Sequence, residues 1–119
     1  MKHDPVQKLR LEVSNGSSDK VQIIKVLGPL TGDNFLDFQV LTRKKPFPPI
    51  MLVDFTETPY VDSAALGSLV GLHVSCEASH RKYALVNANE QLHKLFEMTN
   101  VHSFLVHYNS VAMAEAALS

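Results

Sequence analysis

Ile50-Met-Leu-Val-Asp-Phe-Thr-Glu-Thr-Pro-Tyr-Val-Asp-Ser-Ala-Ala-Leu-Gly67 is the stretch that decides the fold. Its first six residues are apolar apart from Asp54, which is typical of a central strand covered on both faces. A short loop follows, and Asp62 is placed to cap a helix that we expect to run to about His80. Ser63 then stands in the first turn of that helix, beside the sheet.

The rest of the chain repeats this alternation of strand and helix. After an N-terminal hairpin it alternates strictly, which predicts one α/β domain over residues 1–119 with a mostly parallel sheet of about five strands and four helices. Gly67 and Gly71, one helical turn apart, predict a face on which the central helix presses closely on a neighbour. The other strands are expected at 9–13, 21–27, 83–86 and 104–108, and the other helices from Asp33 or Asn34 to about Arg43, around Leu92 to Phe96, and from Ser110 to Leu118.

Composition excludes several classes of protein. The 119 residues are 45% hydrophobic and 19% charged with a net charge of −1, and the scattered Lys and Arg residues form no stripe for nucleic acid. A single cysteine, Cys76, excludes an internal disulfide and suits a reducing compartment. No apolar run reaches the roughly 20 residues of a membrane span, and Met1–Pro5 lacks the apolar core of a signal peptide. We expect a cytoplasmic protein without direct membrane insertion.

Ser63 has a structural and a functional interpretation. Structurally, its hydroxyl would help to satisfy free backbone N–H groups at the start of the helix. Functionally, it would be a phosphorylation site, because a phosphate there would meet the positive end of the helix dipole. The phosphate would add about −1.5 to −2 charges beside Asp62 and near Glu57, which changes a surface without unfolding the domain.

Catalytic interpretations are weaker. Ser63 lies in Val-Asp-Ser-Ala-Ala and not in the Gly-x-Ser-x-Gly elbow of serine hydrolases. Asp54-Phe-Thr56 is similar to the start of haloacid dehalogenase-type phosphatases, but Thr56 occupies the place of their second acid. We expect Asp54 to accept hydrogen bonds from loop N–H groups instead. The histidines lack metal-ligand spacing and no phosphate or dinucleotide loop is present, so we expect no metal and no cofactor.

Val53-Asp54 followed by Val61-Asp-Ser-Ala-Ala-Leu-Gly67 resembles a STAS domain, the family of sulfate-transporter and bacterial anti-sigma factor antagonist domains. The resemblance covers nearly the whole chain, because four further segments match the family in order and spacing. They are Leu27–Leu30, Tyr83–Asn87, Leu92–Val101 and Ala114–Leu118.

The resemblance implies a regulatory protein and not an enzyme. In the antagonist subgroup, the serine after the Asp is phosphorylated by a partner kinase that is also the anti-sigma factor, and the unphosphorylated form binds that partner. Ser63 is the matching position. The implied partner-facing residues are Thr58, Asp62, Ser63, Ala64, Leu66 and Gly67. Two alternatives stay open: an unphosphorylated accessory STAS subunit of a lipid-transport ABC complex, and a homodimer that uses the same helix.

Two departures from the family pattern carry expectations of their own. Pro29 and Thr31 stand where the family often has acidic residues after its second strand, which removes an expected kinase-docking contact. Ala65 stands where the family often has Gly, and we expect its side chain to change how closely a partner approaches the helix.

Overall fold

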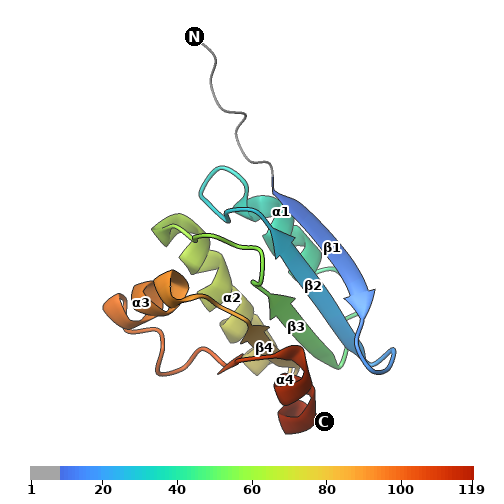
Figure 1. Cartoon of the computed structure of the whole chain (residues 1–119). Coiled ribbons are helices and arrows are strands. Elements are labelled where there is room, and N and C mark those ends of the chain that lie inside the picture. The colour runs from blue at the N-terminus through green and yellow to red at the C-terminus, as the bar shows by residue number, and fades with distance from the viewer. Residues whose placement is uncertain (1–8) are drawn as a thin grey trace.

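The computed structural model describes residues 9–119, and Figure 1 shows a sheet with helices on both faces. Residues 1–8, to which the expectation of no signal peptide refers, lie outside this range. The elements are β1 (Arg10–Asn15), β2 (Val21–Leu27), α1 (Phe35–Thr42), β3 (Ile50–Asp54), α2 (Ser63–Ala78), β4 (Lys82–Val86), α3 (Glu90–Met98), β5 (His107–Tyr108) and α4 (Val111–Leu118).

The sheet has the predicted topology. Its five strands lie in sequence order, β1-β2-β3-β4-β5. β1 pairs antiparallel with β2, and the next three pairings are parallel. The predicted fold class, an α/β domain with an N-terminal hairpin and a mostly parallel sheet, is therefore confirmed.

Two apolar layers enclose β3, which explains its nearly continuous apolar sequence. Met51 and Val53 belong to the larger core cluster, to which α1, α2 and α3 contribute. Ile50 and Leu52 belong to the smaller cluster on the opposite face, which α4 covers. Each alternate side chain of a strand points to the other face, so both sets of residues are buried. No helix within residues 9–119 combines the length and the apolar character needed to cross a bilayer.

Side-chain caps begin three of the four helices. Asp62, Asn89 and Ser110 each accept a hydrogen bond from the backbone N–H three residues later, at the starts of α2, α3 and α4. At α1 the expected cap is absent, because Asn34 folds back onto the preceding loop. Its Oδ1 accepts from the N–H of Thr31 (2.8 Å) instead of from a helical N–H.

The ends of several elements differ from the sequence prediction; β1, expected at 9–13, runs from Arg10 to Asn15. α2 ends at Ala78, and His80 takes a left-handed conformation (φ 56°) that lets the N–H of Arg81 bond to the carbonyl of Cys76 at 2.9 Å. The strand expected from residue 104 begins only at His107, because the N–H of Phe104 bonds locally to Val101 in a turn (3.1 Å). Leu105 is buried from within this turn, and in the sequence a buried residue of a turn looks the same as a buried residue of a strand.

The expected close packing at the two glycines of α2 is wrong for Gly67. A Cβ atom added to Gly67 would meet no heavy atom within 4 Å, and the residue is exposed. A Cβ atom added to Gly71 would lie 3.0 Å from Nη2 of Arg43. The outer face of α2 near Gly67 is therefore free of neighbours in the described part of the chain.

Candidate functional site

Ser63 is the first residue of α2, at the carboxyl end of β3, and its side chain is exposed. The cap of this helix is Asp62, whose Oδ1 accepts the N–H of Ala65 at 2.9 Å. The other carboxylate oxygen, Oδ2, accepts the N–H of Gly32 at 2.9 Å. Since Asp62 does the capping, the Ser63 hydroxyl is not needed for it and faces solvent at the positive end of the helix dipole.

The loop before α2 is held against the loop after β2. Leu30 and Val61 form a parallel bridge, and the N–H of Asp62 donates to the carbonyl of Leu30 (3.2 Å). Gly32 comes so close that an added Cβ would lie 3.2 Å from the Cβ of Ala64. The first turn of α2 and the β2–α1 loop therefore present one continuous surface.

A third loop, between β4 and α3, braces the same region. Asn89 caps α3 and also donates its Nδ2 to the carbonyl oxygens of Thr58 (3.3 Å) and Pro59 (3.2 Å). Asn87, in a left-handed conformation (φ 61°), donates to Asp54 at 3.2 Å. Sequence analysis missed both asparagines as parts of the site. The helix-cap position of Asn89 was the one local signal, and it does not reveal contacts 30 residues away.

The predicted partner-facing residues separate into an exposed and a buried group. Ser63, Ala64 and Gly67 are exposed and Asp62 is half-buried, so these four share the outer surface of the helix start. Thr58 is 2% exposed and donates its hydroxyl to the carbonyl of Val26 (2.8 Å). Its side chain supports the loop from inside, and the structure does not place it where a partner would touch it.

Leu66 and Ala65 also point into the core. Leu66 is 6% exposed and belongs to the cluster beneath α2, so its side chain anchors the helix and does not face a partner. Ala65 is fully buried. The expectation that Ala65 changes the approach of a partner is therefore wrong, because its methyl group points away from the outer surface.

The two carboxylates near Ser63, those of Glu57 and Asp62, differ in whether a cation neutralises them. Glu57 forms an ion pair with Lys25 (3.1 Å), and the hydrogen bond and charge of Glu57 raise the pKa of Lys25. Asp62 has no such cationic partner in the described range, and its carboxylate is held by two backbone N–H groups. A phosphate on Ser63 would add its charge directly beside this carboxylate.

The catalytic alternatives find little support in the geometry. Oδ1 of Asp54 accepts the N–H (2.9 Å) and the hydroxyl (2.6 Å) of Thr56, so the predicted bonding to loop groups is confirmed. His73, on the same helix, lies ten residues or roughly 15 Å from Ser63, too far to act as its general base. Its Nδ1 is instead hydrogen-bonded to the hydroxyl of Tyr83 at 2.7 Å. In residues 9–119 no three His, Cys, Asp or Glu side chains are grouped to hold a metal ion.

Comparison with known protein families identifies the family of this fold. A model of the STAS domain matches residues 12–114, and the chain belongs to the STAS domain family. No curated protein matches the sequence significantly.

Solved structures share the fold at low sequence identity. A putative anti-sigma factor antagonist from Thermotoga maritima has a TM-score of 0.82 and 21% identity, over 91% of this chain and 93% of that chain. The Bacillus cell fate determinant SpoIIAA in the phosphorylated form has a TM-score of 0.66 and 15% identity, over 94% and 100%. A sulfate transporter family protein from Wolinella succinogenes has a TM-score of 0.74 and 16% identity, over 83% and 84%.

Proposed function

We propose that this chain is a non-enzymatic, protein-binding switch of the anti-sigma factor antagonist type. Its unphosphorylated form binds an anti-sigma factor that is also a serine kinase, in the cytoplasm, and phosphorylation of Ser63 weakens the complex. The observation that carries the proposal is the exposure of Ser63 at the first position of α2, beside a carboxylate that already caps the helix.

The similar folds support the same role. One similar structure is described as a putative anti-sigma factor antagonist, and another was solved in a phosphorylated form. The physical reason for a switch is electrostatic. A phosphate adds about −1.5 to −2 charges at pH 7, and unpaired like charges brought together at an interface cost several kcal/mol.

The exposed residues Ser63, Ala64 and Gly67 are small and lie on the outer face of α2. Small side chains let a partner approach the helix backbone closely, so that a group as large as phosphate would prevent that approach by its size as well as its charge. Asp62, half-buried and fixed by two backbone bonds, gives the surface one negative charge before phosphorylation.

The test combines modification with binding. The protein is used to capture partners from extract of its native cells, and the captured kinase is then incubated with it and ATP. Mass spectrometry should find one phosphate, absent from Ser63→Ala and still present in Ser103→Ala, which changes an exposed serine between α3 and β5. Ser63→Asp should lower the affinity for the captured kinase. Phosphate at another residue, or unchanged binding of Ser63→Asp, would refute the proposal.

A second candidate is an accessory STAS subunit of a transport complex that is never phosphorylated. A similar structure from Wolinella succinogenes is described as a sulfate transporter family protein, which favours keeping this candidate. In that case the chain should co-purify with a transporter ATPase, and Ser63→Asp should leave the complex intact.

A further inference from the structure

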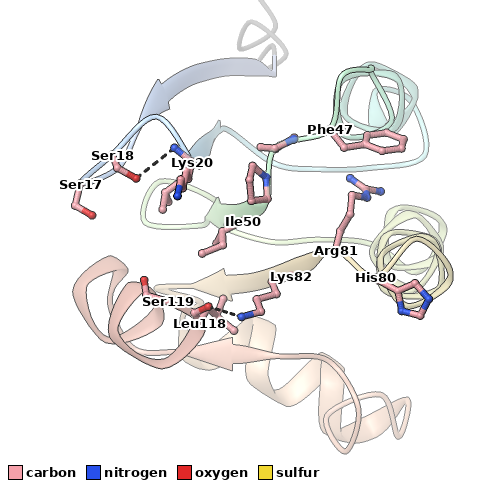
Figure 2. A pocket seen from close by; sticks show the side chains of 13 residues that line it. Ser17, Ser18, Lys20, Phe47, Ile50, His80, Arg81, Lys82, Leu118 and Ser119 are labelled. Carbon is pink, nitrogen blue, oxygen red and sulfur yellow. Dashed lines mark hydrogen bonds between the residues drawn. The ribbon is translucent and has the colours of Figure 1, made fainter.

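The end of the sheet opposite Ser63 contains an open cavity of about 550 Å³, shown in Figure 2. It lies where β2, β3 and β4 begin and where α4 ends. Its volume falls within the roughly 300–1,000 Å³ of small-molecule sites. Its apolar wall consists of Val21, Phe47, Pro48, Pro49, Ile50 and Leu118.

Cationic side chains approach this wall from both faces of the sheet. Lys82 is in register with Ile50 and so points to the α4 side, where its Nζ lies 2.8 Å from the carbonyl oxygen of Leu118. Arg81 precedes it and turns to the other side, with its guanidinium carbon 3.8 Å from the centre of the Phe47 ring. Figure 2 shows Arg81 extending toward Phe47 and Lys82 toward Leu118. The cavity therefore has positive charge on both sides of an apolar strip.

No Asp or Glu side chain of the cavity lining neutralises these charges. Three cationic residues, Lys20, Arg81 and Lys82, line the cavity together with His80, and no Asp or Glu side chain does. Across residues 9–119, no ion pair joins any of the three cations to a carboxylate. Glu115 lies nearby, but its carboxylate accepts the N–H and the hydroxyl of Ser17.

Arg81 is fixed in place but incompletely bonded. Its Nε donates to the hydroxyl of Ser79 (2.9 Å) and its Nη2 to that of Ser75 (3.0 Å). Its Nη1 is buried and has no partner among the described residues. Buried donors normally have partners, because an unpaired one costs free energy. This unmet donor adds to the positive potential at the aromatic wall.

From this charge and shape we propose that the cavity binds a small organic anion with an apolar body. The carboxylate or phosphate head would lie near the ammonium groups of Lys20 and Lys82, which both line the cavity. Lys20 precedes β2 and Lys82 begins β4, the two strands that flank β3. The apolar body would lie along Phe47 and Ile50. This site is separate from the Ser63 surface and does not depend on the function proposed above.

The experiment titrates the intact, isotope-labelled protein with four probes while amide NMR shifts are recorded. Decanoate and decyl phosphate carry both an anionic head and an apolar body, 1-decanol lacks the charge, and inorganic phosphate lacks the apolar body. We expect saturable shifts at Ile50, Arg81 and Lys82 with the two amphiphilic anions and weaker binding of the other two probes. The tighter of the two anions identifies the preferred head group.

Matched variants test the role of charge. Exposed ion pairs are individually weak, so Lys20→Gln/Lys82→Gln should weaken decanoate binding roughly tenfold. Lys94→Gln, on α3 outside the cavity, should leave it unchanged. The proposal is overturned if 1-decanol or inorganic phosphate binds as tightly as decanoate, if the shifts map elsewhere, or if the double variant binds normally while retaining the wild-type amide spectrum elsewhere.

Discussion

Replacing Gly67 by Ala should stabilise the protein. Gly67 lies in the interior of α2, and a Cβ atom there meets nothing within 4 Å. Since Gly costs about 1 kcal/mol relative to Ala inside a helix, Gly67→Ala should raise the free energy of unfolding by that amount. For a domain of this size the corresponding rise in Tm is roughly 4 °C.

The matched control is Gly71→Ala, in the same helix one turn later. Its Cβ would lie 3.0 Å from the guanidinium of Arg43, which must move to admit it. We therefore expect a smaller gain from Gly71→Ala than from Gly67→Ala. Urea unfolding followed by far-UV circular dichroism measures both, with the slope of the unfolding free energy against urea unchanged. Equal effects, or a loss of stability in Gly67→Ala, would refute the reasoning from the open space at Gly67.

The same substitution separates stability from binding. Gly67 lies one turn beyond Ser63 on the outer face of α2, where the proposed partner would approach the helix. An extra methyl group in a tightly packed contact costs about 1–3 kcal/mol, so affinity for the partner kinase should fall roughly tenfold or more. Stability and affinity should thus change in opposite directions. Unchanged affinity in the stabilised variant would show that the partner does not pack at this position.

Three further substitutions test individual hydrogen bonds and one buried tyrosine. Asp62→Ala removes the acceptor of two backbone N–H groups and should lower the unfolding free energy by about 2 kcal/mol, measured in urea. Thr58→Val removes the buried hydrogen bond from the Thr58 hydroxyl and leaves the Val26 carbonyl without that donor. The unfolding free energy should fall by about 1–3 kcal/mol in the same assay. Burial raises the pKa of Tyr83 to about 12 from the ordinary value of 10.0, so the folded state holds this proton more tightly than the unfolded state. The stability that depends on this proton is complete below pH 10 and is lost as the pH rises to 12. Tyr83→Phe should flatten this decline relative to the wild type, whereas Tyr60→Phe, at an exposed tyrosine, should not.

Local sequence predicted the centre of the fold well. The apolar run at β3 and the cap at Asp62 are both determined by residues close in sequence, and both were found where expected. β5 was predicted too long because the apolar residues Phe104 and Leu105 resemble a strand, although Leu105 is buried from within a turn. Periodicity records which residues are buried and does not distinguish the backbone conformation that buries them.

The candidate site was predicted less completely. The family resemblance selects Ser63, but it does not show that Thr58 and Leu66 point inward, because this depends on how α2 is rotated on the sheet. Nor does it show that Gly32 lies against Asp62, since the two residues are 30 positions apart and meet only when β2 and β3 pair. The cavity at the other end of the sheet left no motif, because Lys20 lies about 60 residues from Arg81 and Lys82 in the sequence.

Hydrogen bonds between the loops at the carboxyl edge of the sheet affect how fast a partner would bind to and leave a switch at Ser63. Asp62 bonded to Gly32 and Asn89 bonded to Pro59 hold the serine turn in one shape before any partner arrives. Ordering a mobile side chain at an interface costs about 0.5–1.5 kcal/mol, and a turn already fixed avoids most of that loss of entropy. In the proposed switch, docking is then close to rigid-body association, and we expect a phosphate on Ser63 to act mainly by shortening the lifetime of the complex.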